Sequence, residues 1–241
     1  MKSEKVVVFG ASSGVGEAVA TLARREGAHV VAVGRDAGKL EALGQRLGDG
    51  VTIAAVDASK RADVDAFFRT LGAFDHLVVA LSGGKGAGLF RSLPLDDVRA
   101  GFEGKFFPQL HVAQAALSTL NASGSITFIS AASARSVGPG TSGLAAINAA
   151  IEALVPILAL ELAPIRVNAV SPGIVDTPWW DAMPSDVKAD FFARARATLP
   201  VGRVGTAEEV AELVWFLARA GFVTGSVYEI DGGHRLTASR A

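Results

Sequence analysis

A glycine-rich stretch at residues 9–16 (FGASSGVG) constrains the fold of this chain more than any other feature. An apolar run of strand character precedes it, and an amphipathic helical pattern begins within it. Glycine at positions 10, 14 and 16 lets a ligand approach the backbone closely, and the free N–H groups of a first helical turn attract an anion. Strand, glycine turn and helix N-terminus in this order predict a dinucleotide phosphate site; a purely structural turn is the alternative.

Composition limits the classes of protein that fit. The chain has 241 residues, half of them hydrophobic, and we expect one domain spanning residues 1–241. A net charge of −1 argues against nucleic acid and membrane surfaces as partners. The absence of cysteine excludes disulfides and thiolate catalysis, and the four histidines lack metal-ligand spacing, so no metal site is expected. We see no apolar run approaching the ~18 residues of a membrane span and no signal-peptide pattern, so a cytoplasmic protein is expected.

Apolar runs of strand length alternate with helical patterns along the whole chain. Strands are expected at 6–9, 29–33, 51–56, 75–81, 125–130, 165–170 and 226–230. The runs are continuously apolar rather than alternating, which indicates a mostly parallel sheet covered on both faces. A helical region at 95–120 should be broken or bent near Gly104 and Pro108, and residues 176–200 form an insertion. The pattern predicts an α/β fold.

The helix expected at 143–162 is apolar on more than one face. Its polar residues are few, namely Asn148, Glu152 and Glu161. Two interpretations fit: deep burial in the core, or a subunit interface added to the core contact. Pro156 should bend or divide this helix, because proline removes a backbone donor and clashes with the preceding turn.

Several motifs in order make the chain resemble the short-chain dehydrogenase/reductase family over essentially its whole length. They are the spacing Gly10-x-x-x-Gly14-x-Gly16, Asp57 after the third strand, and the segments 166–173 (RVNAVSPG), 176–178 (DTP), 200–203 (PVGR) and 231–233 (DGG). The resemblance implies a doubly wound Rossmann fold with a seven-stranded parallel sheet, and a nicotinamide dinucleotide bound across its carboxyl edge. It also implies a homodimer or homotetramer.

The resemblance assigns a cofactor-binding set. It consists of Gly10, Ser12, Ser13, Gly14, Val15, Gly16, Gly34, Arg35, Asp57, Ala58, Ser82, Gly83, Pro172, Gly173, Val175 and Thr177. Asp57 should meet the adenine edge, Ser82 the adenosine ribose, and Thr177 the nicotinamide amide or the pyrophosphate. NADP(H) is favoured over NAD(H), because Gly34 stands where a ribose-binding carboxylate would be and the Arg35 guanidinium suits a 2′-phosphate. Asp36 would reverse this preference if a shifted turn brought its carboxylate to the ribose.

The catalytic positions of the family have all changed in this chain. Its serine, tyrosine and lysine fall on Ala131, Leu144 and Asn148, and the single tyrosine, Tyr228, lies in the last strand. The family's structural asparagine aligns with Lys105. We therefore expect a compensated exchange in which Lys105 returns an ammonium to the pocket floor near Asn148; a solvent-facing lysine is the alternative.

Without the tyrosine, a proton must come from another group. Lys105, Asn148 and Ser133 are the catalytic candidates, with Ser130, Thr141, Ser142 or a water held by Lys105 as further sources; the serines could equally be caps or turn residues. The 176–200 insertion resembles the family's substrate lid. Its aromatic residues favour an apolar or aromatic substrate or pack on the last helix.

Two functions follow from these patterns. The first is an NADP(H)-dependent oxidoreductase that acts on an unidentified carbonyl or alcohol with an atypical active site. The second is a catalytically silent NADP(H)-binding sensor or scaffold. The glycine loop supports cofactor binding under both interpretations, whereas the lost tyrosine favours the second and the expected Lys105 exchange favours the first.

Overall fold

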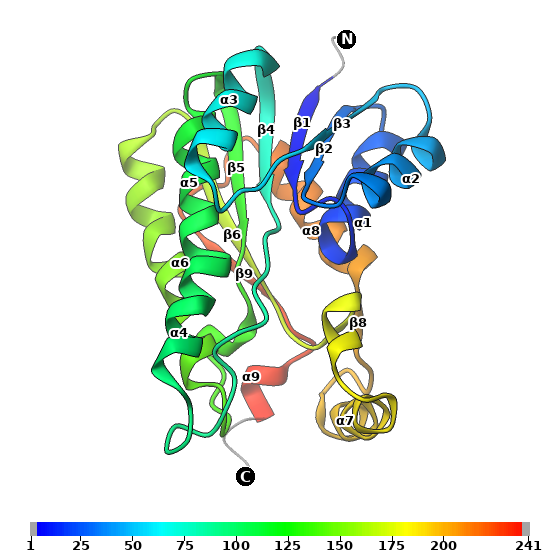
Figure 1. Ribbon diagram of the computed structural model, residues 1–241, viewed down its shortest axis with the longest axis vertical. Coiled ribbons are helices and arrows are strands. Elements are labelled where there is room, and N and C mark those ends of the chain that lie inside the picture. Colours follow the sequence, from blue (N-terminus) through cyan, green and yellow to red (C-terminus); the bar gives the residue numbers. More distant parts are fainter. Residues whose placement is uncertain (1–3, 238–241) are drawn as a thin grey trace.

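A seven-stranded sheet forms the centre of the molecule, and all of its neighbouring strands pair in parallel (Figure 1). The computed structural model describes residues 4–237. The strand order is β3-β2-β1-β4-β5-β6-β9. Its strands are β1 (Lys5–Phe9), β2 (His29–Gly34), β3 (Val51–Ala55), β4 (Phe74–Val79), β5 (Leu120–Ile129), β6 (Arg166–Pro172) and β9 (Val227–Ile230). The expected doubly wound Rossmann sheet is confirmed.

Helices cover both faces of the sheet. The helices of the described residues are α1 (Gly14–Arg25), α2 (Ala37–Leu47), α3 (Arg61–Leu71), α4 (Leu95–Gly101), α5 (Phe107–Ala116), α6 (Ser142–Glu161), α7 (Ser185–Thr198), α8 (Ala207–Arg219) and α9 (His234–Thr237). Of these, α4, α7 and α9 contribute no residue to the core clusters that cover the sheet. Residues of α1, α2 and α8 share one core cluster with the sheet, and residues of α3, α5 and α6 share the other. Val6 and Val8 belong to the first cluster, whereas Val7 and Phe9 belong to the second. Because successive side chains point to opposite faces, a strand buried on both sides is continuously apolar.

The strand order reverses between β1 and β4, and this reversal fixes where a ligand can bind. From β1 the chain proceeds outward through β2 and β3, then returns to place β4 on the other side of β1. The loops after β1 and β4 therefore diverge and leave a crevice at the carboxyl edge of the sheet. The glycine-rich stretch occupies the β1–α1 connection at this edge.

The expected irregularity of the 95–120 region is present as a π-helical turn. This turn, η1 (Phe102–Phe106), joins α4 to α5, and it contains Gly104 and Lys105. The helical region ends at Ala116 rather than near Leu120, because β5 begins five residues earlier than the apolar run indicates. Wider hydrogen-bond spacing of this kind rotates the side chains of one turn relative to a regular helix.

Helix α6 departs from two expectations. Pro156 does not divide it: α6 is continuous from Ser142 to Glu161, because the loss of one backbone donor is offset by packing of Ile151 and Val155 in the core. Its length and mean hydropathy also reach those of a membrane-spanning helix, so the expectation that no such run is present was wrong. The core helices of soluble proteins can reach the same length and hydropathy. Burial in the core alone is wrong for its outer face, where Ile157 and Leu160 are 53% and 82% exposed.

The 176–200 insertion forms a separate layer beside the carboxyl edge. It begins at the end of β7 (Val175–Asp176), which pairs with β8 (Gly205–Thr206) after the insertion. Within it lie the 3-10 turn η3 (Pro178–Ala182) and α7 (Figure 1). The Trp180 ring lies 4.8 Å from the Phe191 ring and 5.7 Å from the Phe192 ring. The aromatic residues therefore pack mainly on one another and stabilise the insertion from within.

Candidate active site

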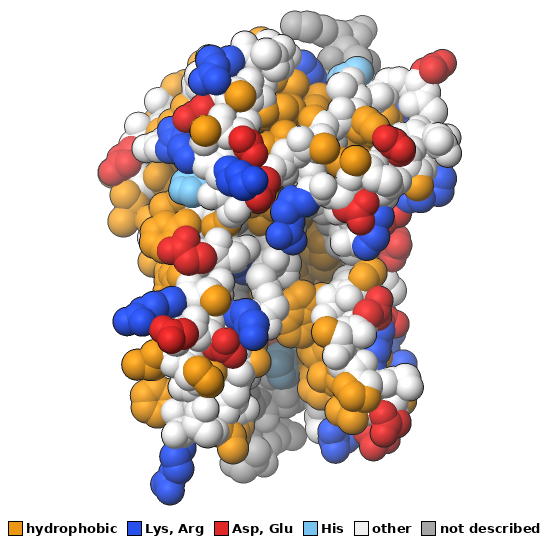
Figure 2. Space-filling view, viewed as in Figure 1, with side chains coloured by type: hydrophobic (Ala, Val, Ile, Leu, Met, Phe, Trp, Pro, Cys, Tyr) orange, Lys and Arg blue, Asp and Glu red, His pale blue; other side chains and the backbone are white. Residues whose placement is uncertain are grey.

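A cavity of about 810 Å³ opens at the carboxyl edge of the sheet. It runs from the β1–α1 turn to the 176–200 insertion, and Figure 2 shows the surface hollowed between these parts of the molecule. Loops after β1, β2, β3, β4, β5 and β6 all contribute to its walls. The volume is at the upper end of the range for small-molecule and cofactor sites.

The glycine turn at one end of the cavity fits a pyrophosphate. A Cβ atom on Gly16 would lie 2.2 Å from the Gly10 carbonyl oxygen, and one on Gly10 would lie 2.5 Å from the Ala80 carbonyl oxygen. Only glycine allows these backbones to approach so closely. Ser13 is the N-cap residue of α1 but its side chain makes no capping hydrogen bond, so the first-turn N–H groups stay open to an anion.

The next section of the wall, after β2, carries two cations. Arg35 and Lys39 line the cavity beside Gly34, where a Cβ atom would lie 3.2 Å from Ser12 Oγ. Asp36 does not line the cavity; it is the N-cap of α2, and its Oδ1 accepts a hydrogen bond from the Lys39 N–H at 3.0 Å. The shifted turn that would bring its carboxylate to a ribose is therefore absent from this arrangement.

Asp57 and Ala58 line the same wall after β3. Asp57 Oδ1 accepts hydrogen bonds from the Ser59 hydroxyl at 2.7 Å and the Ser59 N–H at 3.1 Å. The hydroxyl bond is the largest cause that lowers the pKa of Asp57 below its usual range. The fixed carboxylate is an acceptor for a ligand N–H at this position.

The loops after β4 and β6 form the remaining walls of the cavity. Ser82 and Gly83 line one side, and Pro172, Gly173, Val175 and Thr177 line the other. The methyl group of Thr177 would lie 3.7 Å from a Cβ on Gly14, so this loop reaches the glycine turn. Trp179 of the insertion donates from Nε1 to the Gly83 carbonyl oxygen at 3.2 Å and thus bridges the two sides.

The three residues that the resemblance assigns to the family's catalytic positions all lie at the cavity wall. Ala131, Leu144 and Asn148 all line the cavity, whereas Tyr228 of β9 does not. Neither alanine nor leucine can donate or accept a proton. The structure thus brings the expected positions together but leaves the tyrosine unavailable.

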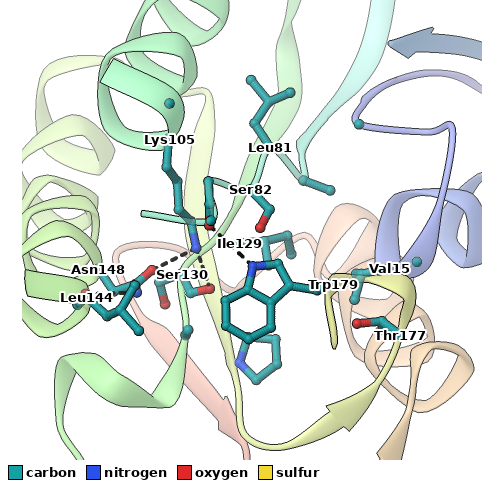
Figure 3. Close-up of a pocket in the computed structure, with 18 of the residues that line it drawn as sticks. Val15, Leu81, Ser82, Lys105, Ile129, Ser130, Leu144, Asn148, Thr177 and Trp179 are labelled. Atoms are coloured by element: carbon teal, nitrogen blue, oxygen red, sulfur yellow. Dashed lines mark hydrogen bonds between the residues drawn. The ribbon is translucent and has the colours of Figure 1, made fainter. Parts of the chain in front are cut away.

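Lys105 enters this floor from the π-helical turn on the opposite side. Its Nζ donates to Asn148 Oδ1 at 2.7 Å and to the Ser130 carbonyl oxygen at 3.0 Å (Figure 3). The side chain is buried, so the solvent-facing alternative is wrong. Burial lowers the pKa of Lys105 to about 8, opposed by the negative charge of Glu152, which raises it. An ammonium has three N–H donors, so one is left for a ligand.

Asn148 extends the network toward the substrate side. Its Nδ2 donates to Ser133 Oγ at 3.1 Å and to the Leu144 carbonyl oxygen at 2.9 Å. The Ser133 hydroxyl proton has no acceptor among residues 4–237, and Ser133 lines the cavity. Lys105, Asn148 and Ser133 therefore form a connected polar array facing the space beside Pro172 and Trp179.

Sequence reasoning missed the acidic residue behind this array. Glu152 lies one helical turn after Asn148, and its Oε1 accepts from Ser130 Oγ at 2.8 Å and Ser171 Oγ at 2.9 Å. Arg135 Nε donates to Glu152 Oε2 at 2.7 Å. The i, i+4 spacing from Asn148 on an otherwise apolar helix was the available signal, because residues four apart share a helix face.

Comparison with known proteins agrees with the fold and the cavity. The family model described as enoyl-(acyl carrier protein) reductase matches residues 10–235. The chain is 32% identical to the short-chain dehydrogenase/reductase ATR9 of Stachybotrys chlorohalonatus, over 97% of both chains. It is 30% identical to the 3-oxoacyl-(acyl-carrier-protein) reductase FabG of Chlamydia muridarum, over 96% of this chain and 97% of that one.

A solved structure also supports membership of this family. The crystal structure of a small-chain dehydrogenase in complex with NADPH superposes with a TM-score of 0.85 at 34% identity, covering 98% of this chain and 100% of that one. This chain belongs to the short-chain dehydrogenase/reductase family of oxidoreductases.

Proposed function

We propose that this protein is an NADP(H)-dependent oxidoreductase that reduces a carbonyl group to an alcohol, or carries out the reverse reaction. The observation that carries the proposal is the buried Lys105 ammonium, held by Asn148 at the floor of a cavity that fits a dinucleotide. The NADPH complex of the related small-chain dehydrogenase supports the choice of cofactor. NADPH, when bound, supplies the hydride.

The residues of the cavity wall described above would bind the cofactor. The open N–H groups of the Ser13–Val15 turn would hold the pyrophosphate, and Thr177 lies against that turn. Arg35 with Lys39 supplies positive charge for a 2′-phosphate, while Asp36 is engaged in capping α2. These positions support a preference for NADP(H) over NAD(H).

In the proposed mechanism Lys105 replaces the missing tyrosine as the acid. Two of its protons are fixed by Asn148 and the Ser130 carbonyl, and the third is given to the substrate oxygen as it gains negative charge. Ser133 donates its free hydroxyl proton to the same oxygen and so orients it. Asn148 holds both donors in place. The alcohol then leaves, and solvent returns a proton to Lys105.

The walls beside this array favour an uncharged, apolar or aromatic substrate. Leu144 and Ile147 line one side, and Trp179, Trp180 and Phe191 of the insertion line the other. Flat ring faces in the same cavity as the donors suit an aryl or alkyl group attached to the carbonyl. The insertion thus serves as a substrate lid.

The outer face of α6 supports a homodimer or homotetramer. Ile157 and Leu160 expose large apolar side chains that a second copy of the chain would cover. Light scattering on the purified protein tests this, and a monomer at micromolar concentration would contradict it.

A second function has one specific observation in its favour. Leu144 stands at the family's tyrosine position and has no proton to give, which supports a silent NADP(H)-binding sensor or scaffold. The two functions share the cofactor but differ in turnover.

The deciding experiment measures binding and turnover separately. Calorimetric titration with NADPH and NADH gives the two affinities, and absorbance at 340 nm follows NADPH oxidation with a panel of aryl, alkyl and cyclic ketones and aldehydes. Oxidation with any substrate in the panel, absent without it, supports the reductase. Tight NADPH binding with no oxidation across the panel supports the sensor or scaffold, and no binding of either cofactor overturns both.

A further inference from the structure

We infer that Glu152 is the counter-ion of Lys105, a positioning residue that acts through Ser130 to hold the ammonium charged at the cavity floor. Its importance for catalysis rests on the proposed function, but the charge relationship itself does not. Glu152 does not itself line the cavity, and Ser130, which does, lies between it and Lys105.

Ser130 joins the two charges through its two oxygen atoms. Its carbonyl oxygen accepts from Lys105 Nζ at 3.0 Å, and its hydroxyl donates to Glu152 Oε1 at 2.8 Å. Ser130 is only 2% exposed, so this connection is shielded from bulk solvent. Opposite charges that share a buried bridging residue interact in a medium of low dielectric constant.

Helix α6 fixes both partners of Lys105 at once. Asn148 and Glu152 are four residues apart and project from one face, so the amide reaches Nζ directly while the carboxylate lies one turn further along. The Glu152 side chain is 7% exposed and is held by three donors, from Ser130, Ser171 and Arg135. A buried carboxylate with this set of donors cannot turn away to solvent.

The other titratable groups near Lys105 are exposed, are paired elsewhere or, like His234, are half-buried at the cavity wall. On its own π-helical turn, Glu103 lines the cavity and is exposed. On the loop after β4, Lys85 pairs with Asp97 at 3.4 Å with its side chain 61% exposed. Beyond η2 (Ala132–Ala134), Arg135 is 47% exposed and divides its contacts between Glu152 and Glu229. His234 lines the cavity from α9. Glu152 is the charge that acts on the pKa of Lys105.

The energetic argument follows from the cost of burying a charge. Lysines buried without a counter-ion titrate near ~5–6, and they are then neutral at physiological pH. Burial is the larger influence on Lys105 and lowers its pKa, but the charge of Glu152 limits the fall to about 8. Lys105 therefore stays mostly an ammonium at neutral pH while remaining acidic enough to release a proton.

The test measures the charge of Lys105 directly, without cofactor or substrate. The chain has seven lysines, so a protein labelled with [13C]lysine gives few Cε resonances, and Lys105→Met assigns the one from Lys105. We expect a midpoint near 8 in the wild type and below 7 in Glu152→Gln. Arg135→Gln is the matched control, because it removes a contact of Glu152 but leaves its charge; its midpoint should stay at or above the wild-type value.

Three results would overturn the inference. They are a Glu152→Gln midpoint equal to the wild type, an Arg135→Gln midpoint lowered as much as that of Glu152→Gln, or a wild-type midpoint of 6 or below. If Glu152→Gln fails to fold, the wild-type and Arg135→Gln titrations decide. The titration does not depend on turnover. If the midpoints are as expected but the protein has no reductase activity, the reductase proposal fails and the assignment of Glu152 as counter-ion stands.

Discussion

Lys105 and Asn148 lie 43 positions apart in the chain, and their side chains are joined by a hydrogen bond of 2.7 Å at the cavity floor. In the family resemblance, lysine belongs at the position of Asn148 and asparagine at that of Lys105. The structure places the Lys105 ammonium of η1 against Asn148 of α6, as the expected exchange of the two residue types requires. The exchange itself stays a prediction from the resemblance.

Removal of the Lys105 ammonium should abolish most of the turnover. Lys105→Met keeps the length of the side chain and removes the acid, and we expect kcat to fall by about 10²–10⁴-fold, the range for loss of a general acid. NADPH affinity, measured by calorimetry, should change far less, since the pyrophosphate turn lies at the other end of the cavity. An unchanged kcat would exclude Lys105 as the proton donor.

The rate of reduction should fall as the pH rises through about 8. Lys105 must be protonated to give its proton, and its pKa is lowered to about 8 by burial. Above this value the ammonium fraction, and with it kcat, decreases about tenfold per pH unit. The pH profile of single-turnover NADPH oxidation checks this, and in Glu152→Gln the same decline should begin at lower pH. A flat profile between pH 7 and 9.5 would contradict the role of Lys105.

Arg35 should determine the choice between the two cofactors. Arg35→Ala removes a guanidinium from the wall that also carries Lys39, and we expect NADPH affinity to fall by about 10-fold or more, or ~1.4 kcal/mol or more. NADH has no 2′-phosphate, so its affinity should change by less than about twofold. Equal losses for both cofactors would show that Arg35 does not read the phosphate.

The Trp179 contact with Gly83 should control access to the cavity. The indole N–H bridges the loops after β4 and β6, and Trp179→Phe keeps a ring but removes this donor. We expect faster NADPH release in stopped-flow fluorescence, with the affinity weakened by about 3–10-fold, as for one lost hydrogen bond. Phe191→Leu, which changes the lid without touching that bond, is the control and should leave the release rate close to wild type.

The close approach of Gly16 to Gly10 should make the phosphate turn intolerant of even a methyl group. In Gly16→Ala the new Cβ would lie 2.2 Å from a backbone oxygen, so the β1–α1 turn must move. We expect a loss of unfolding free energy of about 2 kcal/mol or more, together with loss of NADPH binding. Gly221→Ala, where nothing lies within 4 Å, should be nearly neutral in urea denaturation. Equal stability of both variants would contradict the close contact.

Much of the fold was predictable because its causes are local. Continuous apolar runs indicated strands that are buried on both faces. Gly10, Gly14 and Gly16 indicated a turn that only glycine allows. The start of β5 and the continuity of α6 through Pro156 were not predictable, because sheet pairing and core packing outweigh local preference there.

At the candidate site, the sequence by itself determined which groups are present and which are missing. It contains one tyrosine, Tyr228, and by the resemblance it predicts Leu144 at the tyrosine position and Lys105 at an exchanged one. Only the tertiary structure decided that the Lys105 side chain turns inward to Asn148, and that Glu152 stands behind it through Ser130. The physical reason is that the charge of a buried lysine depends on the distances to its partners. Those distances are set by the packing of η1 against α6 and β5, which no single segment of the chain encodes.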